Sequence, residues 1–118
     1  MSLFRPAGAN YVPVLDIAAA ASWYADKFGL RQYVTKFDDG QKGVELSDSG
    51  EVFFVVGPRG LPATDETPML YTSRIEKARK HLSSRGVTIG EIQHDRQLTR
   101  FFEMRDLEGN ITEIVDGP

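Results

Sequence analysis

Tyr11-Val12-Pro13-Val14-Leu15-Asp16 and its later counterpart Met69-Leu70-Tyr71-Thr72-Ser73 are the two stretches that decide the fold. Each is a short apolar strand whose last residue, an aspartate or a serine, is suited to cap the start of a helix. A glycine that can end such a helix follows thirteen residues later in both cases, at Gly29 and at Gly86. One layout therefore occurs twice, which predicts that the chain contains a duplicated unit.

Each copy continues from its helix into further β-rich segments. The expected strands are 9–15, 31–37, 42–47 and 51–56 in the first copy, and 67–72, 87–94, 98–105 and 110–115 in the second. Each half is therefore expected to run β-α-β-β-β, in modules 8–57 and 67–117 joined by a breaker-rich linker at 58–66. A parallel doubly wound fold would alternate strands and helices throughout, so this order favours an α+β class in one domain of 118 residues.

The last strands of the two copies align without a gap. Glu51-Val52-Phe53-Phe54-Val55-Val56 stands against Asn110-Ile111-Thr112-Glu113-Ile114-Val115. This alignment predicts that Phe54 and Glu113 hold equivalent positions. A duplicated unit usually places its site between the copies, so equivalent positions can be compared within one sequence.

The composition restricts the possible partners. The net charge is −3 and the lysines and arginines are scattered, so no basic footprint for nucleic acid is visible. There is no cysteine, which removes disulfides, thiolate catalysis and zinc-thiolate sites from consideration. No apolar run approaches the ~20 residues of a membrane-spanning helix, and no signal peptide opens the chain, so we expect a cytoplasmic protein without a membrane partner.

Two motifs lie at opposite ends of the repeated layout. The first is Val14-Leu15-Asp16, then Trp23-Tyr24, then Phe28-Gly29 at the helix end. The second is Asp106-Leu107-Glu108-Gly109-Asn110, followed by a strand that carries Glu113. With these motifs the chain resembles the vicinal-oxygen-chelate superfamily, also called the glyoxalase/bleomycin-resistance/dioxygenase family. The resemblance covers roughly residues 8–117. It implies two βαβββ modules whose curved mixed sheets surround a cleft, and members commonly form homodimers.

Chemistry in this family usually depends on a divalent metal held by His, Glu or Gln on the first and last strands of each module. Carried onto this sequence, the resemblance implies a set of Ala9, Phe54, Thr67 and Glu113. Only Glu113 is a competent ligand, and one carboxylate does not hold a metal against water. We therefore expect no metal and no cofactor. Glu45 is the alternative first-half ligand if the strand register differs, but neither acid has a histidine beside it.

The two histidines do not complete a metal site in the sequence. His81 is expected to be exposed on the second helix, and His94 to lie at a strand end or in a loop, either solvated or reaching the mouth of the cleft. Neither forms a His-x-His or His-x-Glu pair.

Alternation along the strands gives the expected lining of the cleft. The predicted ligand-binding residues are mostly aromatic or apolar, with one acid at the centre: Tyr11, Phe54, Thr67, Met69, Tyr71 and Glu113. The favoured interpretation is a metal-free protein, and not an enzyme, that sequesters an amphipathic or aromatic small molecule. The alternative is a metal-dependent glyoxalase-type lyase or isomerase, a thiol transferase or a dioxygenase. We expect a homodimer in either case.

Overall fold

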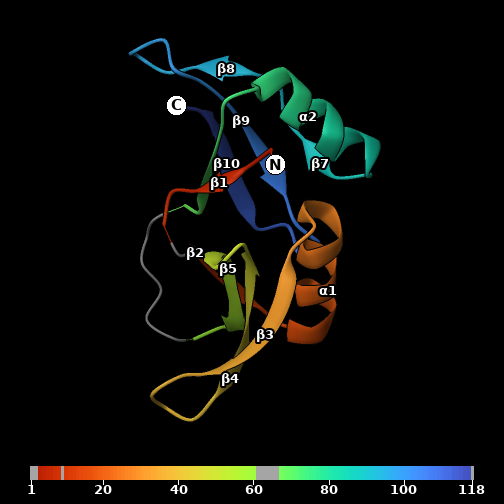
Figure 1. Ribbon diagram of the computed structural model, residues 1–118, viewed down its shortest axis with the longest axis vertical. Coiled ribbons are helices and arrows are strands. Elements are labelled where there is room, and N and C mark those ends of the chain that lie inside the picture. The colour runs from red at the N-terminus through yellow and green to blue at the C-terminus, as the bar shows by residue number, and fades with distance from the viewer. Residues whose placement is uncertain (1–2, 9, 61–66, 118) are drawn as a thin grey trace.

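A computed structural model describes residues 3–8, 10–60 and 67–117 (Figure 1). The first half contains β1 (Arg5–Pro6), β2 (Asn10–Val14), α1 (Ile17–Phe28), β3 (Arg31–Lys36), β4 (Lys42–Asp48) and β5 (Glu51–Pro58). The second half contains β6 (Met69–Thr72), α2 (Ile75–Ser84), β7 (Thr88–Ile89), β8 (Gln93–His94), β9 (Arg100–Arg105) and β10 (Ile111–Asp116). The strand expected at 87–94 is thus two short strands, and β5 extends to Pro58 within the expected linker.

Two mixed sheets confirm the α+β class. The first has the strand order β2-β5-β4-β3, with β2 parallel to β5 and the other pairs antiparallel. The second has the order β6-β10-β9-β7, with β8 also paired to β9 and β6 parallel to β10. The short strand β1 is antiparallel to β6, so the beginning of the chain joins the sheet of the second half.

The two helices begin differently. The Asp16 side chain accepts a hydrogen bond from the Ala19 N–H at 3.0 Å, and α1 ends at Gly29 with φ of 65°. The expected cap at Ser73 is wrong, because α2 has Arg74 at its N-cap and no side-chain capping bond. Instead, the hydroxyl of Thr72 accepts from the Arg74 N–H at 3.2 Å, which moves the helix start one residue on.

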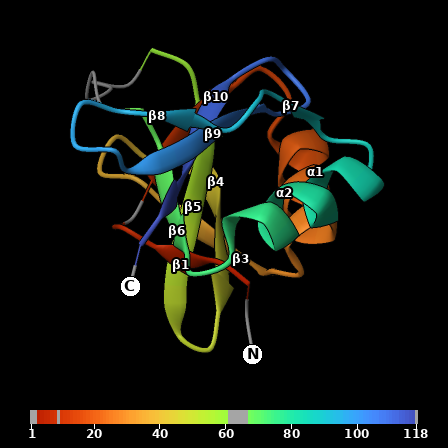
Figure 2. The same cartoon turned by 90° about the horizontal axis from the view of Figure 1, so that it is seen from above.

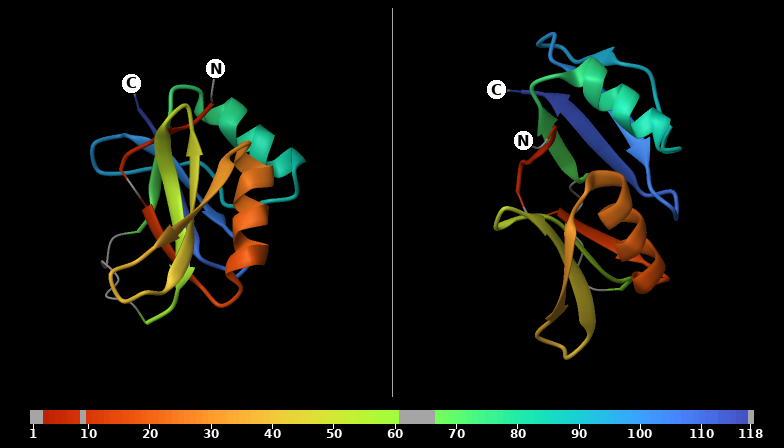
Figure 3. Two further views of the ribbon diagram at one scale, coloured as in Figure 1. Left: turned by 60° about the horizontal axis from the view of Figure 1, so that its bottom comes forward. Right: turned by 45° about the vertical axis from the view of Figure 1, so that its right-hand side comes forward.

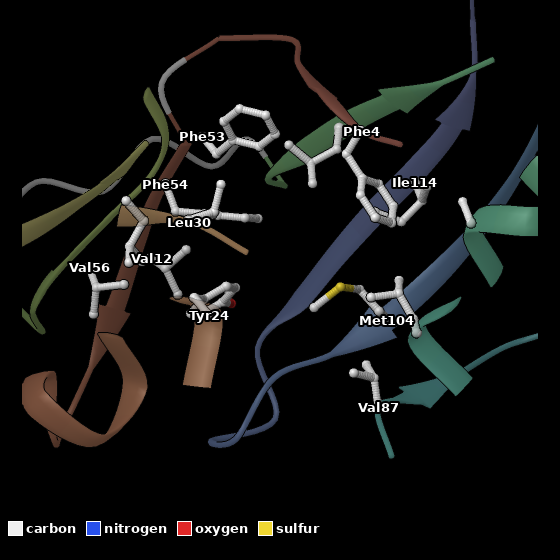
Figure 4. Packing of buried hydrophobic residues seen from close by; sticks show 14 of the residues in the cluster. Phe4, Val12, Tyr24, Leu30, Phe53, Phe54, Val56, Val87, Met104 and Ile114 are labelled. Atoms are coloured by element: carbon white, nitrogen blue, oxygen red, sulfur yellow. The ribbon is translucent and has the colours of Figure 1, made fainter. Parts of the chain in front are cut away.

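Both helices cover the same side of the sheets, so the core is shared by the two halves (Figures 2 and 3). Figure 4 shows Tyr24 and Val56 from the first half in one layer with Met104 and Ile114 from the second. The Tyr24 and Phe54 rings lie 4.5 Å apart between centroids, and Phe54 lies 5.5 Å from Phe28. Within the described residues, no helix is long and apolar enough to span a membrane.

A β-bulge sets the register of the repeat. β4 pairs Leu46 with Phe54 and then Ser47 with Val52, so Phe53 is an extra residue in β5. Tyr11 pairs with Val55 in the first half, whereas Met69 pairs with Glu113 in the second. Because Tyr11 and Met69 each precede a helix N-cap by five residues, Val55 is the structural counterpart of Glu113. The alignment that matched Phe54 with Glu113 is wrong by this one residue.

A polar seam joins the halves at the β9–β10 turn. Asp106 Oδ2 accepts from the Tyr24 hydroxyl at 2.7 Å, and the Asn110 side chain donates to the Pro13 carbonyl at 3.2 Å. The carboxylate of Glu108 accepts from the backbone N–H groups of Leu15 and Asp16 at 2.8 and 2.9 Å. These hydrogen bonds, followed by the Arg59 charge at 3.3 Å, lower the pKa of Glu108.

The depressed pKa of Glu108 predicts a pH-dependent stability. A carboxyl whose folded pKa lies below its unfolded value of about 4.3 stabilises the fold above that value, and the contribution is lost as the pH falls through the folded pKa. Glu108→Gln should therefore lower the Tm by roughly 2–5 °C at pH 7, and by much less at pH 3. Calorimetry of both proteins across this range measures the difference. Glu51→Gln, which removes an exposed acid, is the control. An equal loss for Glu108→Gln at both pH values would contradict the assigned hydrogen bonds.

Candidate functional site

Each sheet has one face against the helices and a second face, here called the open face, that carries no helix (Figure 3). Burial alternates along the strands: Val12 and Val14 are buried while Tyr11 and Pro13 are not. In the same way Leu70 is buried, whereas its neighbours in β6 are only partly so. The open faces are therefore the surfaces on which strand side chains can meet a ligand.

The predicted site residues divide by their position. Tyr11, Met69, Tyr71 and Glu113 lie on the open faces and are partly exposed. Thr67 is exposed and lies just before β6. The expectation that Phe54 lines the cleft is wrong, because its side chain is fully buried beneath α1 and Val55 takes the open-face position. Ala9 lies outside the described residues.

Tyr11 is held in place on the first open face. Its hydroxyl donates to the Pro58 carbonyl at 2.6 Å, and its ring meets Phe37 edge-on at 5.9 Å. Both rings cover Gly57, where an added Cβ would lie 2.7 Å from the Tyr11 hydroxyl oxygen. Desolvation, and then the nearby charge of Asp39, raise the pKa of Tyr11. Tyr11 is therefore a fixed, protonated aromatic surface.

Two carboxylates lie side by side on the second open face. Glu113 in β10 pairs directly with Glu103 in β9, and both are partly exposed. No hydrogen bond or ion pair to another described residue neutralises either carboxylate. Tyr71 and Phe101 flank Val115 on the same face, and the Arg5 guanidinium carbon lies 5.9 Å from the centroid of the Tyr71 ring. This face thus combines aromatic rings with uncompensated negative charge.

The first open face is hollowed near Glu45. A depression of about 460 Å³ is lined by Arg31, Tyr33, Glu45, Ser47 and Val52, among others. Tyr33 pairs with Glu45, and Glu45 in turn pairs with Val55. Sequence reasoning weighed Glu45 but missed Arg31 and Tyr33. Alternation along residues 31–36 would have placed these two on one face.

The donor set does not fit a divalent metal. In the part of the chain that the structure describes, no group of three or more His, Asp or Glu side chains could hold a metal ion. Glu45 and Glu113 belong to different sheets. His94 is exposed in β8, and His81 lies 3.3 Å from the Lys27 carbonyl and packs against Phe4. The described side chains therefore support no metal chemistry, and the absence of a metal from the protein stays a prediction.

Comparisons with known proteins agree on the architecture. No family model matches the sequence, and a search of curated proteins found no relative. Solved structures do match. A member of the glyoxalase/bleomycin resistance protein/dioxygenase superfamily from Sphaerobacter thermophilus DSM 20745 has a TM-score of 0.72 and 21% identity, over 92% of this chain and 94% of that one.

Two proteins from Streptomyces sp. CB03234 are also similar. TnmS3, described as an antibiotic binding protein, has a TM-score of 0.70 at 19% identity over 89% of both chains. A glyoxalase/bleomycin resistance protein has a TM-score of 0.68 at 19% identity, over 92% of this chain and 99% of the other. With the sheet order and the helix positions, these matches establish that the chain has the fold of the glyoxalase/bleomycin resistance protein/dioxygenase superfamily.

Proposed function

We propose that this protein is a metal-free binding protein for a small amphipathic molecule that carries an aromatic group and a positive charge. The observation that carries the proposal is the pair Glu103 and Glu113 on the second open face. Like charges directly opposite each other in a sheet destabilise it, so a bound cation would relieve a repulsion that no described residue neutralises. The ligand would thus be held by charge as well as by apolar burial.

The rings beside this acid pair support the same ligand chemistry. The guanidinium of Arg5 already lies over the face of the Tyr71 ring in a cation–π contact. Phe101, Met69 and Val115 add partly exposed apolar surface around the carboxylates. An amphipathic cation can use both features, whereas an anion would meet uncompensated negative charge.

The similar structures and the lack of a metal-ligating group among the described residues both favour binding over metal-dependent catalysis. One similar structure is described as an antibiotic binding protein, which at this identity is an analogy of fold and not of ligand. A metal-dependent lyase, transferase or dioxygenase needs converging nitrogen or oxygen donors, which the described residues do not supply. A metal-free binding role is therefore the better-supported proposal.

A second copy of the chain is part of the proposal. Within the described residues, β3 is an edge strand paired only with β4, and Tyr33 and Val34 on it are 50% and 76% exposed. Unpaired strand edges and exposed apolar side chains favour association, so we propose a homodimer whose interface covers this edge.

The dimer predicts twice the monomer mass in solution. Light scattering at tens of micromolar should give about double the 13.2 kDa of one chain. Val34→Lys should shift the protein toward the monomer. Leu98→Lys, at an exposed position in the loop between β8 and β9, should not. A monomer mass for the unmodified protein would refute the homodimer.

The metal-free proposal predicts the metal content of the purified protein. Elemental analysis should find far less than one Zn, Ni, Mn or Fe per chain, because the donor set is incomplete. Added Ni²⁺ or Zn²⁺ should leave the Tm unchanged. About one metal per chain, removable by a chelator with loss of a lyase activity, would instead support the enzyme alternative.

The acid pair predicts the charge preference of the ligand site. Thioflavin T, a cationic aromatic dye, should bind with enhanced fluorescence, and the anionic dye anilinonaphthalene sulfonate should bind at least about tenfold more weakly. Glu113→Gln keeps the shape but removes one charge, and should weaken thioflavin T binding by about tenfold. Glu91→Gln, whose side chain is 92% exposed in the loop before β8, should have no effect. Equal binding of the cationic dye to both variants and the parent would overturn the assignment of the site to this face.

A further inference from the structure

The two halves meet at two equivalent places, where the turn before the last strand of one half approaches the strand–helix junction of the other half. The side chains at these two places differ. At one seam, the Glu108 carboxylate from the β9–β10 turn accepts from the N–H groups of Leu15 and Asp16, where β2 leads into α1. The equivalent junction in the second half is Ser73 and Arg74, where β6 leads into α2. The element that approaches this junction is the β4–β5 turn.

The β4–β5 turn has no counterpart of Glu108. The first-half turn runs Asp48-Ser49-Gly50, whereas the second-half turn runs Asp106-Leu107-Glu108-Gly109. Gly50 and Gly109 match, because both have positive φ, 81° and 84°, just before the last strand of their half. The first-half turn is therefore one residue shorter, and Ser49 stands where the other half has a leucine and the glutamate.

A cavity of about 430 Å³ lies where the missing glutamate would reach. Its lining includes Ser49 from the turn, Ser73 and Arg74 from the junction, and Arg5 from β1. The Arg74 side chain forms no ion pair with another described residue, and Arg5 contacts the Tyr71 ring and not an acid. The carboxylate position that Glu108 fills at one junction is thus open at the other, where Arg74, which has no ion-pair partner among the described residues, is part of the lining.

The rest of the lining defines the ligand. Phe53 and Phe4, each 3% exposed, and Leu3 give the cavity an apolar wall. Asp48 and Glu51 also line it, so the formal charges of the lining side chains cancel and a multiply charged anion such as a phosphate is disfavoured. A single carboxylate matches the donors, as Glu108 does at the other seam. Because the Arg74 N–H already donates to the Thr72 hydroxyl, the Arg74 guanidinium takes over that part of the recognition.

We infer that this cavity binds the carboxylate of a small apolar monocarboxylic acid, at a site distinct from the acid pair on the second open face. The carboxylate occupies the position equivalent to that of Glu108, and the apolar group packs against Phe53. The site uses neither Glu103 nor Glu113, so it takes an anion where the open face takes a cation.

Titration of the ¹⁵N-labelled protein with 3-phenylpropionate tests the inference. The amide signals of Ser49, Gly50, Ser73 and Arg74 should shift and saturate, with a dissociation constant of about 1 mM for so small a ligand. The neutral isostere 3-phenylpropanamide should bind at least about tenfold more weakly. Shifts confined to the open faces, or equal affinity for acid and amide, would overturn the proposal.

Two variants sharpen the test. Arg74→Gln should weaken 3-phenylpropionate by about tenfold, whereas Arg96→Gln, in the exposed loop after β8, should leave its affinity unchanged. Insertion of a glutamate between Ser49 and Gly50 rebuilds the turn of the other half and should abolish binding while it raises the Tm. Undiminished binding to either cavity variant would refute the site. Thioflavin T binding at the open face should not change in these variants, so the two proposals fail separately.

Discussion

The buried carboxylate of Asp106 is the group on which the joining of the two halves depends. It accepts hydrogen bonds from the Tyr24 hydroxyl at 2.7 Å, from the Glu108 and Asn110 N–H groups at 2.9 and 2.8 Å, and from the Asn110 side chain at 3.0 Å. Desolvation, and then the charge of Asp106, raise the pKa of Tyr24, so its hydroxyl stays protonated and donates. Removal of any partner would leave a buried charge incompletely hydrogen-bonded, which is among the costliest local changes in a protein.

This anchor fixes α1 against the second sheet, and the open faces follow from it. With both helices on one side, the opposite faces of β2, β5, β6 and β10 are left for other uses (Figure 3). The Asn10 side chain extends the arrangement across the middle of the molecule, because it donates to the Met69 carbonyl at 3.0 Å and accepts from the Met69 N–H at 3.1 Å. The Asn10 side chain thereby makes the two hydrogen bonds to Met69 that the backbone of a neighbouring strand would make. These bonds hold the two sheets next to each other.

The duplicated layout could be read from the sequence because it depends on local signals: Asp16 as a cap, Gly29 and Gly86 with positive φ, and alternation along the strands. The face of Glu113 and Tyr71 followed from the same alternation. The position of Phe54 could not, because it depends on the bulge at Phe53. Nothing local in Glu51-Val52-Phe53-Phe54 marks an extra residue. The bulge allows both phenylalanines to be buried, Phe54 under α1 and Phe53 against the cavity beside the β4–β5 turn. The helix start after Thr72 likewise depends on which of two neighbouring hydroxyl groups meets the Arg74 N–H.

The departures from symmetry are where the two halves acquire separate chemistry. At equivalent open-face positions, one half has Val55 and the other Glu113, so an acid lies directly opposite another acid on the second sheet, whereas Glu45 on the first sheet lies opposite Val55. At equivalent turns, the second half has a carboxylate that accepts from backbone N–H groups of the first half, whereas the turn of the first half borders a cavity whose lining includes Arg5 and Arg74. Because the open-face position lies outside the shared core, its side chain can vary without a change of fold. Selection on a duplicated scaffold of this kind can therefore alter the ligand of one half while the seam at Asp106 continues to hold the molecule together.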